Sequence, residues 1–179
     1  MAGLRFRGSP LRLPASYGPA GTGEGDWVAV EARLAEARNY WIVTVRADGG
    51  PHAAPVWGGW LDGAVWFSTD PDSVKGRNLD ERPEAVVHLE SGDEVVIVEG
   101  LVGPAPGSRF EAFRAEYRRK YDFEHPDVGA PGAAVFVVTP RRILTWNERK
   151  FPASGVAWTP GEGWGRGAEV PAARLSVAL

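Results

Sequence analysis

The chain has 179 residues, and its 20 lysines and arginines against 23 aspartates and glutamates give a formal net charge of −3 at pH 7. This length suits one domain with a substantial core, and a slightly acidic chain is a poor candidate for nucleic-acid binding. The absence of cysteine excludes disulfides and thiolate chemistry.

The two ends of the chain differ from its middle. Residues 1–26 are rich in Gly and Pro and lack the apolar core of a signal peptide, and no stretch approaches the roughly 18 apolar residues of a membrane span. We expect a cytoplasmic protein that contacts no membrane. The predicted parts are a flexible N-terminal arm over 1–26, one folded domain over 27–158 and a C-terminal tail over 159–179 without assigned structure.

The first half of the domain reads as a helix followed by a β-meander. Apolar residues recur at helical spacing between Trp27 and Asn39. β-Branched and aromatic residues then fill 40–46, 52–60 and 64–68, with Asp-Gly turns between these runs. A short polar helix is predicted over 73–81, which Pro83 ends.

The second half continues with the same kinds of element. A hairpin is predicted over 84–103, and an amphipathic helix over 108–122 whose apolar stripe reads as core packing. Strands at 134–139 and 142–146 complete the series. Short antiparallel strands with helices between them favour a mainly β fold that closes into a barrel. We expect Trp41 and Trp66 to fill its interior.

A cluster of polar side chains lies where the strand 64–68 meets the helix 73–81. The backbone N–H groups at a helix N-terminus are unpaired and attract anions. Side chains there that can donate to a phosphate are Ser68, Thr69, Ser73, Lys75 and Asn78. The sequence therefore predicts a phosphate-binding site, and the alternative is a capped surface helix with a solvated lysine.

The order of motifs around this cluster resembles the pyridoxamine-5'-phosphate-oxidase-like split-barrel superfamily of flavin and deazaflavin proteins. The matching features are an Asp-Gly turn before GPHAAPVW, the WFST strand and the pattern SxxKxRNLxxxP, within a resemblance that covers 28–158. It implies a six-stranded antiparallel Greek-key split β-barrel with flanking helices. It also implies a homodimer with cofactors in the grooves between subunits, where Trp146 and Trp158 would lie.

The resemblance implies a set of cofactor-binding residues. The second strand would lie beside an isoalloxazine-type ring, and the strand end and polar helix would hold the phosphate. The residues implied are His52, Ala54, Pro55, Val56, Trp57, Ser68, Thr69, Ser73, Val74, Lys75 and Asn78.

Departures from the family patterns bear on the choice of cofactor. Pyridoxamine phosphate oxidases proper have cations at positions that correspond here to Ala54, Gly59 and Val74, and charge-assisted bonds to phosphate are strong. The pattern KxRNL is closer to the branch that uses coenzyme F420, a deazaflavin. That branch usually has an arginine where this chain has Ala157. We therefore favour F420, with FMN as the alternative.

The function expected is hydride transfer to a small unsaturated or conjugated carbonyl substrate. The alternatives are an FMN-dependent reductase or oxidase, and a non-catalytic protein that binds flavin, haem or another tetrapyrrole. No catalytic residue is assigned because the hydride chemistry belongs to the cofactor. Tyr117, Tyr121 and His52 are the candidate proton donors. His88 and His125 lack a second ligand at useful spacing, so we predict no metal site.

Overall fold

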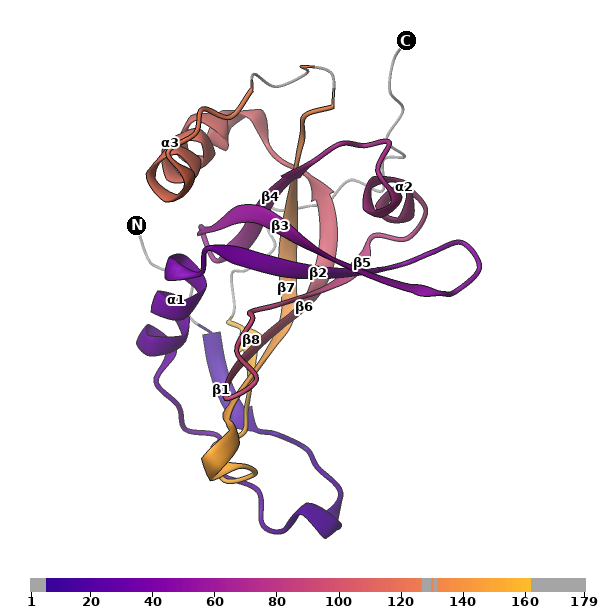
Figure 1. The fold of residues 1–179 in the computed structure, drawn as a ribbon. Coiled ribbons are helices and arrows are strands. Elements are labelled where there is room, and N and C mark those ends of the chain that lie inside the picture. The colour runs from indigo at the N-terminus through magenta and orange to yellow at the C-terminus, as the bar shows by residue number, and fades with distance from the viewer. Residues whose placement is uncertain (1–5, 127–129, 131, 162–179) are drawn as a thin grey trace.

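The computed structural model describes residues 6–126, 130 and 132–161 (Figure 1). Six antiparallel strands close into a barrel, each bonded to the next in the order β7-β4-β3-β2-β5-β6 and back to β7. They are β2 (Asn39–Val45), β3 (Pro51–Leu61), β4 (Ala64–Thr69), β5 (Glu84–His88), β6 (Glu94–Pro104) and β7 (Ala134–Asn147). The predicted mainly β fold and six-stranded antiparallel barrel are confirmed.

The barrel core uses one face of each strand. In β2 the side chains of Tyr40, Ile42 and Thr44 are buried and those between them are half-exposed, because successive residues of a strand point to opposite faces. Phe67 of β4 and Phe136 of β7 stack inside with ring centroids 5.5 Å apart. One continuous apolar cluster therefore fills the barrel.

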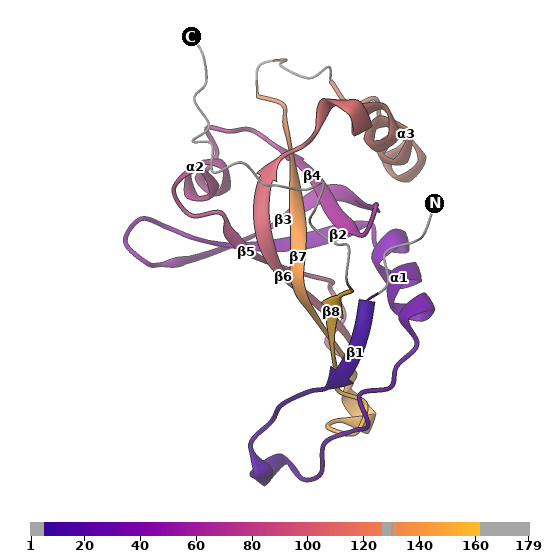
Figure 2. The same ribbon diagram turned by 180° about the vertical axis from the view of Figure 1, so that it is seen from behind.

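Two helices lie near opposite ends of β2. In α1 (Trp27–Glu36), Val30 and Leu34 join the core. In α2 (Val74–Glu81), Leu79 joins the same core from the other end. The barrel is thus covered where β2 begins and where it finishes, as both views show (Figures 1 and 2).

The third helix, α3 (Phe110–Tyr121), packs outside the barrel against β3 and β4. Its stripe of Phe110, Phe113, Tyr117 and Tyr121 is buried in a second apolar cluster together with Trp66. Trp66 is buried, but on the outer face of the barrel wall. Short 3-10 turns cover Ala15–Tyr17, Gly107–Arg109 and Glu148–Lys150.

The interior position predicted for two tryptophans is wrong. Trp66 packs against Phe113 of α3, with ring centroids 6.0 Å apart. Trp41 alternates with the buried residues of β2, is half-exposed on the outer face and stacks on His88 at 6.3 Å. Propensity identified both strands, but it does not say which face each residue takes.

β7 is one strand where the sequence predicts two. Gly100 of β6 pairs with Pro140 and Glu99 pairs with Arg142, so Arg141 is an extra residue that forms a bulge. A Cβ at Gly100 would lie 2.3 Å from the carbonyl oxygen of Thr139, so only glycine fits opposite the bulge. This arrangement lets proline remain within a continuous strand.

Both ends of the domain extend the sheet beyond the barrel. β8 (Val156–Pro160) pairs with β7, and β1 (Phe6–Pro10) pairs with β8 (Figure 2). Pairing of β1 differs from the expectation of an unstructured N-terminal arm, because Phe6 stacks on Trp27 at 4.2 Å and joins the core. Residues 162–179 of the predicted tail lie outside the described residues.

Trp158 does not occupy the groove expected for it. Its indole is buried in the core, and its Nε1 donates to Thr145 Oγ1 at 2.8 Å. Trp146 is half-exposed and packs against Phe151. In the described part of the chain, no helix is both long and apolar enough to cross a membrane.

Candidate functional site

The implied ring-binding strand, β3, presents different residues on its two faces. His52 and Ala54 share the face of Val56, whose side chain is in the core. Pro55 and Trp57 are exposed on the outer face. The predicted residues of β3 are therefore divided between the barrel interior and its outer surface.

Of the three hydroxyl side chains predicted at the end of β4 and the start of α2, the structure brings two together. Thr69 Oγ1 and Ser73 Oγ lie 3.3 Å apart, and Ser73 caps α2 by accepting the N–H of Gly76 at 3.2 Å. Ser68 shares the outer face of β4 with Trp66, so it alternates away from Thr69. A Cβ at Gly76 would lie 2.2 Å from the Pro71 carbonyl oxygen, so the first turn of α2 packs tightly on the preceding loop.

Arg46 and His52 lie side by side, and the charge of Lys75, in the first turn of α2, also acts on His52; we call these three residues the basic cluster. Arg46 Nη2 lies 3.3 Å from His52 Nδ1. Partial burial, and then the positive charges of Arg46 and Lys75, lower the pKa of His52 below its usual range. Within the described residues no carboxylate forms a salt bridge with Arg46 or Lys75. The cluster is suited to a bound anion.

Arg46 was missed at the sequence level. It precedes the Asp-Gly turn of the β2–β3 hairpin, 29 positions before Lys75 in the printed sequence, and no local motif links the two. The hairpin is held over α2 by Arg82, which donates to the carbonyl oxygens of Arg46 at 3.2 Å and Ala47 at 3.1 Å. Arg82 is the C-cap of α2, so this contact fixes the hairpin beside the C-terminal end of the helix.

The other predicted residues of α2 have different surroundings. Asn78 is buried, and its Nδ2 donates to Thr44 Oγ1 at 2.9 Å. Its amide hydrogen is thus used to attach α2 to β2. Val74 is exposed on the first turn of the helix.

An aromatic surface lies at the other end of β3. The indole of Trp57 is 41% exposed and lies nearly parallel to the ring of Tyr121, with centroids 4.6 Å apart. Phe123 is exposed 6.3 Å from the same indole. A planar ligand would find one open aromatic face here.

The candidate proton donors are poorly suited to that role. Burial raises the pKa of Tyr117 to about 12. Burial also raises the pKa of Tyr121, whose hydroxyl already donates to the carbonyl oxygen of Arg38 at 2.6 Å. Both phenols are weaker acids than a free tyrosine, so the structure favours packing and hydrogen-bonding roles.

The remaining histidines have aromatic neighbours. His125 is buried among the rings of Phe110, Phe113 and Tyr117, with centroids 5.0–5.6 Å away. His88 is half-exposed and stacked on Trp41. Among the described residues, no group of three or more His, Asp or Glu side chains could hold a metal ion.

A hollow of about 130 Å³ lies between α1, β7 and β8, away from the basic cluster. It is lined by Asp26, Trp158 and Asn147, and its one arginine, Arg33, pairs with Glu94 at 2.9 Å. Sites for drug-sized ligands measure roughly 300–1,000 Å³. This hollow is too small for a flavin-type cofactor.

Comparison with known proteins agrees with this geometry. The family model for pyridoxamine 5'-phosphate oxidase matches residues 28–147. The chain belongs to the pyridoxamine 5'-phosphate oxidase family. Membership supports a flavin-type oxidoreductase as the general class, without fixing cofactor or substrate. No curated protein matches the chain.

Solved structures with the same fold have low sequence identity. A conserved hypothetical protein from Mycobacterium tuberculosis has a TM-score of 0.61 and 21% identity, over 71% of this chain and 88% of that one. A structure described as an F420 reductase has a TM-score of 0.51 and 23% identity, over 63% and 94% of the two chains.

A haem binding protein from Mycobacterium smegmatis has a TM-score of 0.57 and 22% identity, over 68% of this chain. The match spans 55% of the length of that haem binding protein. At these identities the similarities show the shared fold alone.

Proposed function

We propose that this protein is an oxidoreductase that binds coenzyme F420 at the interface of a homodimer. It transfers hydride to a small unsaturated or conjugated carbonyl compound. The observation that carries the proposal is the basic cluster beside the N-terminus of α2, at the end of the strand that the family places next to the cofactor. An FMN-dependent reductase or oxidase is the alternative.

The residues at this position fit a phosphate group. Arg46 and Lys75 supply charge, and the Thr69 and Ser73 hydroxyls lie 3.3 Å apart at the N-terminus of α2. Burial is the main cause of the lowered His52 pKa, and a phosphate bound there would offset the second cause, the positive charges of Arg46 and Lys75. Lys75 in the first turn opposes the helix dipole unless an anion lies nearby.

The cations that are missing here, relative to pyridoxamine phosphate oxidases proper, favour a phosphodiester over a phosphomonoester. The F420 phosphate is a diester with one negative charge, whereas a monoester such as that of FMN carries about −1.5 to −2 at neutral pH. Ala54 and Val74 add no charge near the cluster. Gly59 does not bear on this choice, because a Cβ there would lie 2.8 Å from Cγ of Glu116, under α3.

When bound, reduced F420 supplies the hydride, and the protein binds and orients the reactants. Pro55 and Trp57 on the outer face of β3 are the proposed ring contacts. Lys75, Arg46, Ser73 and Thr69 are the proposed phosphate contacts. No side chain of this chain needs to serve as a general acid.

A second copy of the chain would complete the site. The outer sheet face exposes apolar side chains on three adjacent strands: Trp41 and Val43 of β2, Pro55 and Trp57 of β3, and Val86 of β5. An uncovered apolar face of this kind favours association, and homodimers bury the same patch on both subunits. The partners proposed are thus a second copy and a small-molecule substrate.

Titration of cofactor-stripped protein with F420 and, separately, with FMN tests the choice of cofactor. We expect saturable fluorescence changes with a lower Kd for F420. Preferential binding of FMN would transfer the protein to the flavin alternative. If the protein binds neither F420 nor FMN, the proposal is wrong.

A non-catalytic tetrapyrrole-binding role is the second candidate. It is favoured by the half-exposed imidazole of His88, stacked on Trp41 within the apolar outer face, and by the fold shared with a haem binding protein. Haemin titration of the His88→Ala variant tests it. A Soret shift that depends on His88, without any F420 binding, would favour this candidate.

A further inference from the structure

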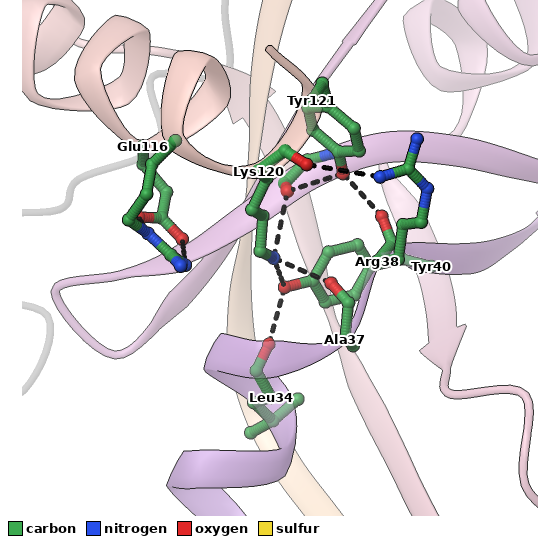
Figure 3. Close-up of polar contacts among 9 residues, drawn as sticks. Leu34, Ala37, Arg38, Tyr40, Glu116, Lys120 and Tyr121 are labelled. Carbon is green, nitrogen blue, oxygen red and sulfur yellow. Dashed lines mark hydrogen bonds and ion pairs between the residues drawn. The ribbon is translucent and has the colours of Figure 1, made fainter.

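The last turn of α3, with Lys120 and Tyr121 (Figure 3), forms hydrogen bonds with Gly58 of β3, the residue after Trp57. The hydroxyl of Tyr121 accepts the N–H of Gly58 at 2.8 Å and donates to the carbonyl oxygen of Arg38 at 2.6 Å. One phenol thereby connects α3 to β3 and to the segment that leads into β2.

Lys120 makes a second connection from the same turn. Its Nζ donates to the carbonyl oxygen of Ala37 at 2.7 Å, to Tyr40 Oη at 2.8 Å and to the carbonyl oxygen of Gly58 at 3.2 Å. Tyr40 in turn donates to the carbonyl oxygen of Leu34 in α1 at 2.5 Å. The three protons of one ammonium group therefore meet three oxygens (Figure 3).

The result is that α3 side chains hold both backbone groups of Gly58. Tyr121 accepts its N–H, and its carbonyl oxygen lies 3.2 Å from Lys120 Nζ and 2.9 Å from the Tyr121 hydroxyl. Gly58 itself is required by packing, because a Cβ there would lie 2.1 Å from the carbonyl oxygen of Trp66. The preceding residue, Trp57, rests on the ring of Tyr121 at 4.6 Å with an interplanar angle of 6°. Position and plane of the indole thus depend on the same two residues of α3.

We propose that Tyr121 and Lys120 are positioning residues, which hold Trp57 with one indole face on Tyr121 and the other open to a planar ring. The importance of this for the cofactor rests on the proposed function, in which Trp57 contacts that ring. A fixed aromatic face binds a planar ligand with less loss of side-chain freedom than a mobile one. The helix that sequence patterns assign to core packing therefore shapes the ligand face.

The first variant tests the role of the Tyr121 hydroxyl separately from that of its aromatic ring. Tyr121→Phe keeps the ring under Trp57 and removes the acceptor of the buried Gly58 N–H. Tyr17→Phe is the matched control, because Tyr17 is exposed and lies near Phe151 rather than α3. Lys120→Met, with Lys150→Met as its control on an exposed lysine, tests the second connection.

The position of the Trp57 indole is measured by ¹⁹F NMR of protein labelled with 5-fluorotryptophan. The Trp57 resonance is the one absent from a Trp57→Phe variant. We expect it to shift or broaden in Tyr121→Phe and Lys120→Met but not in either control. A Trp57 resonance that is unchanged in both α3 variants, while they remain folded by circular dichroism, would overturn the proposal.

F420 and FMN titrations of the same variants give an independent readout. We expect about tenfold weaker binding in Tyr121→Phe, because a Trp57 side chain that is mobile in the free protein must be immobilised when the cofactor ring binds. A displaced Trp57 resonance with unchanged cofactor affinity would uphold the positioning role and remove Trp57 from the cofactor site. Failure of the unaltered protein to bind either cofactor would defeat the proposed function but leave the NMR test intact.

Discussion

At the scale of single residues, Lys75 and Lys120 have different surroundings and different roles. Lys75 lies in the basic cluster, where positive charge accumulates without a carboxylate partner among the described residues. Lys120 is partly buried and its ammonium group is surrounded by oxygens of three other segments. The first is placed to bind an anion and the second to join helix to barrel.

Lys120 gives a prediction for stability against pH. Burial lowers its pKa to about 8; of the nearby charges, Glu116 opposes the shift and Arg119 adds to it. Because the ordinary lysine pKa is about 10.4, the unfolded chain binds more protons between these values, so this group makes the free energy of unfolding rise with pH in that window.

Denaturant titrations between pH 7 and 10 check this prediction. The difference in unfolding free energy between the unaltered protein and Lys120→Met should be constant below pH 8. It should then shift in favour of the unaltered protein as pH rises. Partial exposure of Lys120 reduces the size of this change in unfolding free energy, and the prediction concerns its direction. A difference that stays flat across the range would contradict the assigned environment of Lys120.

At the scale of elements, the start of α2 combines stability with the proposed binding site. Ser73 Oγ accepts the N–H of Gly76 and lies beside Thr69. Ser73→Ala removes this cap and is expected to lower the unfolding free energy by about 1 kcal/mol. It should also weaken cofactor binding.

Ser108→Ala is the control for Ser73, because Ser108 is exposed and is not the N-cap of a helix. Urea denaturation and cofactor titration of both variants are the measurements. If Ser73→Ala binds cofactor as tightly as the control does, the hydroxyl cap plays no part in the site.

Elements were predictable from sequence where local periodicity decides them. The helix near 27–39, the meander over 40–68 and the polar helix over 73–81 follow from apolar spacing and turn residues. The continuity of β7 was not predictable in this way. Pro140 locally indicates a break in the strand, but a bulge opposite Gly100 keeps the strand continuous. Pairing across 40 residues of chain is invisible to a local pattern.

Contacts between elements explain the misses in the site. The hydroxyl pair of Thr69 and Ser73 was predictable because four positions separate the two residues. Arg46 and Tyr121 were not, since each reaches the site only when a hairpin or helix folds back. From the sequence Tyr121 is one of three candidate proton donors, whereas in the structure its hydroxyl contacts the Gly58 and Arg38 backbone.

At the scale of the whole molecule, the β3-β2-β5 face keeps partly exposed apolar side chains in the described part of the chain, while α3 covers the neighbouring wall (Figure 1). The apolar side chains of that face include Trp41 at its centre, between Pro55 on one side and His88 on the other. We expect light scattering to give twice the mass of the chain at micromolar concentration.

Trp41→Glu is expected to return a folded monomer, because a buried unpaired carboxylate opposes association of two such faces. Val28→Glu is the control, since Val28 is an exposed apolar residue on α1. A dimer that persists in Trp41→Glu would place the interface elsewhere. The cofactor groove proposed on this face would then lose its second wall.

The most direct test of the central claim is isothermal titration of F420 into the unaltered protein and into Lys75→Ala. We predict saturable binding with one F420 per chain and at least about tenfold weaker binding in Lys75→Ala, as expected for loss of a charge-assisted phosphate contact. Lys150→Ala, which alters an exposed lysine outside the basic cluster, should bind as the unaltered protein does. Equal affinity in a folded Lys75→Ala variant would contradict the phosphate site and the function built on it.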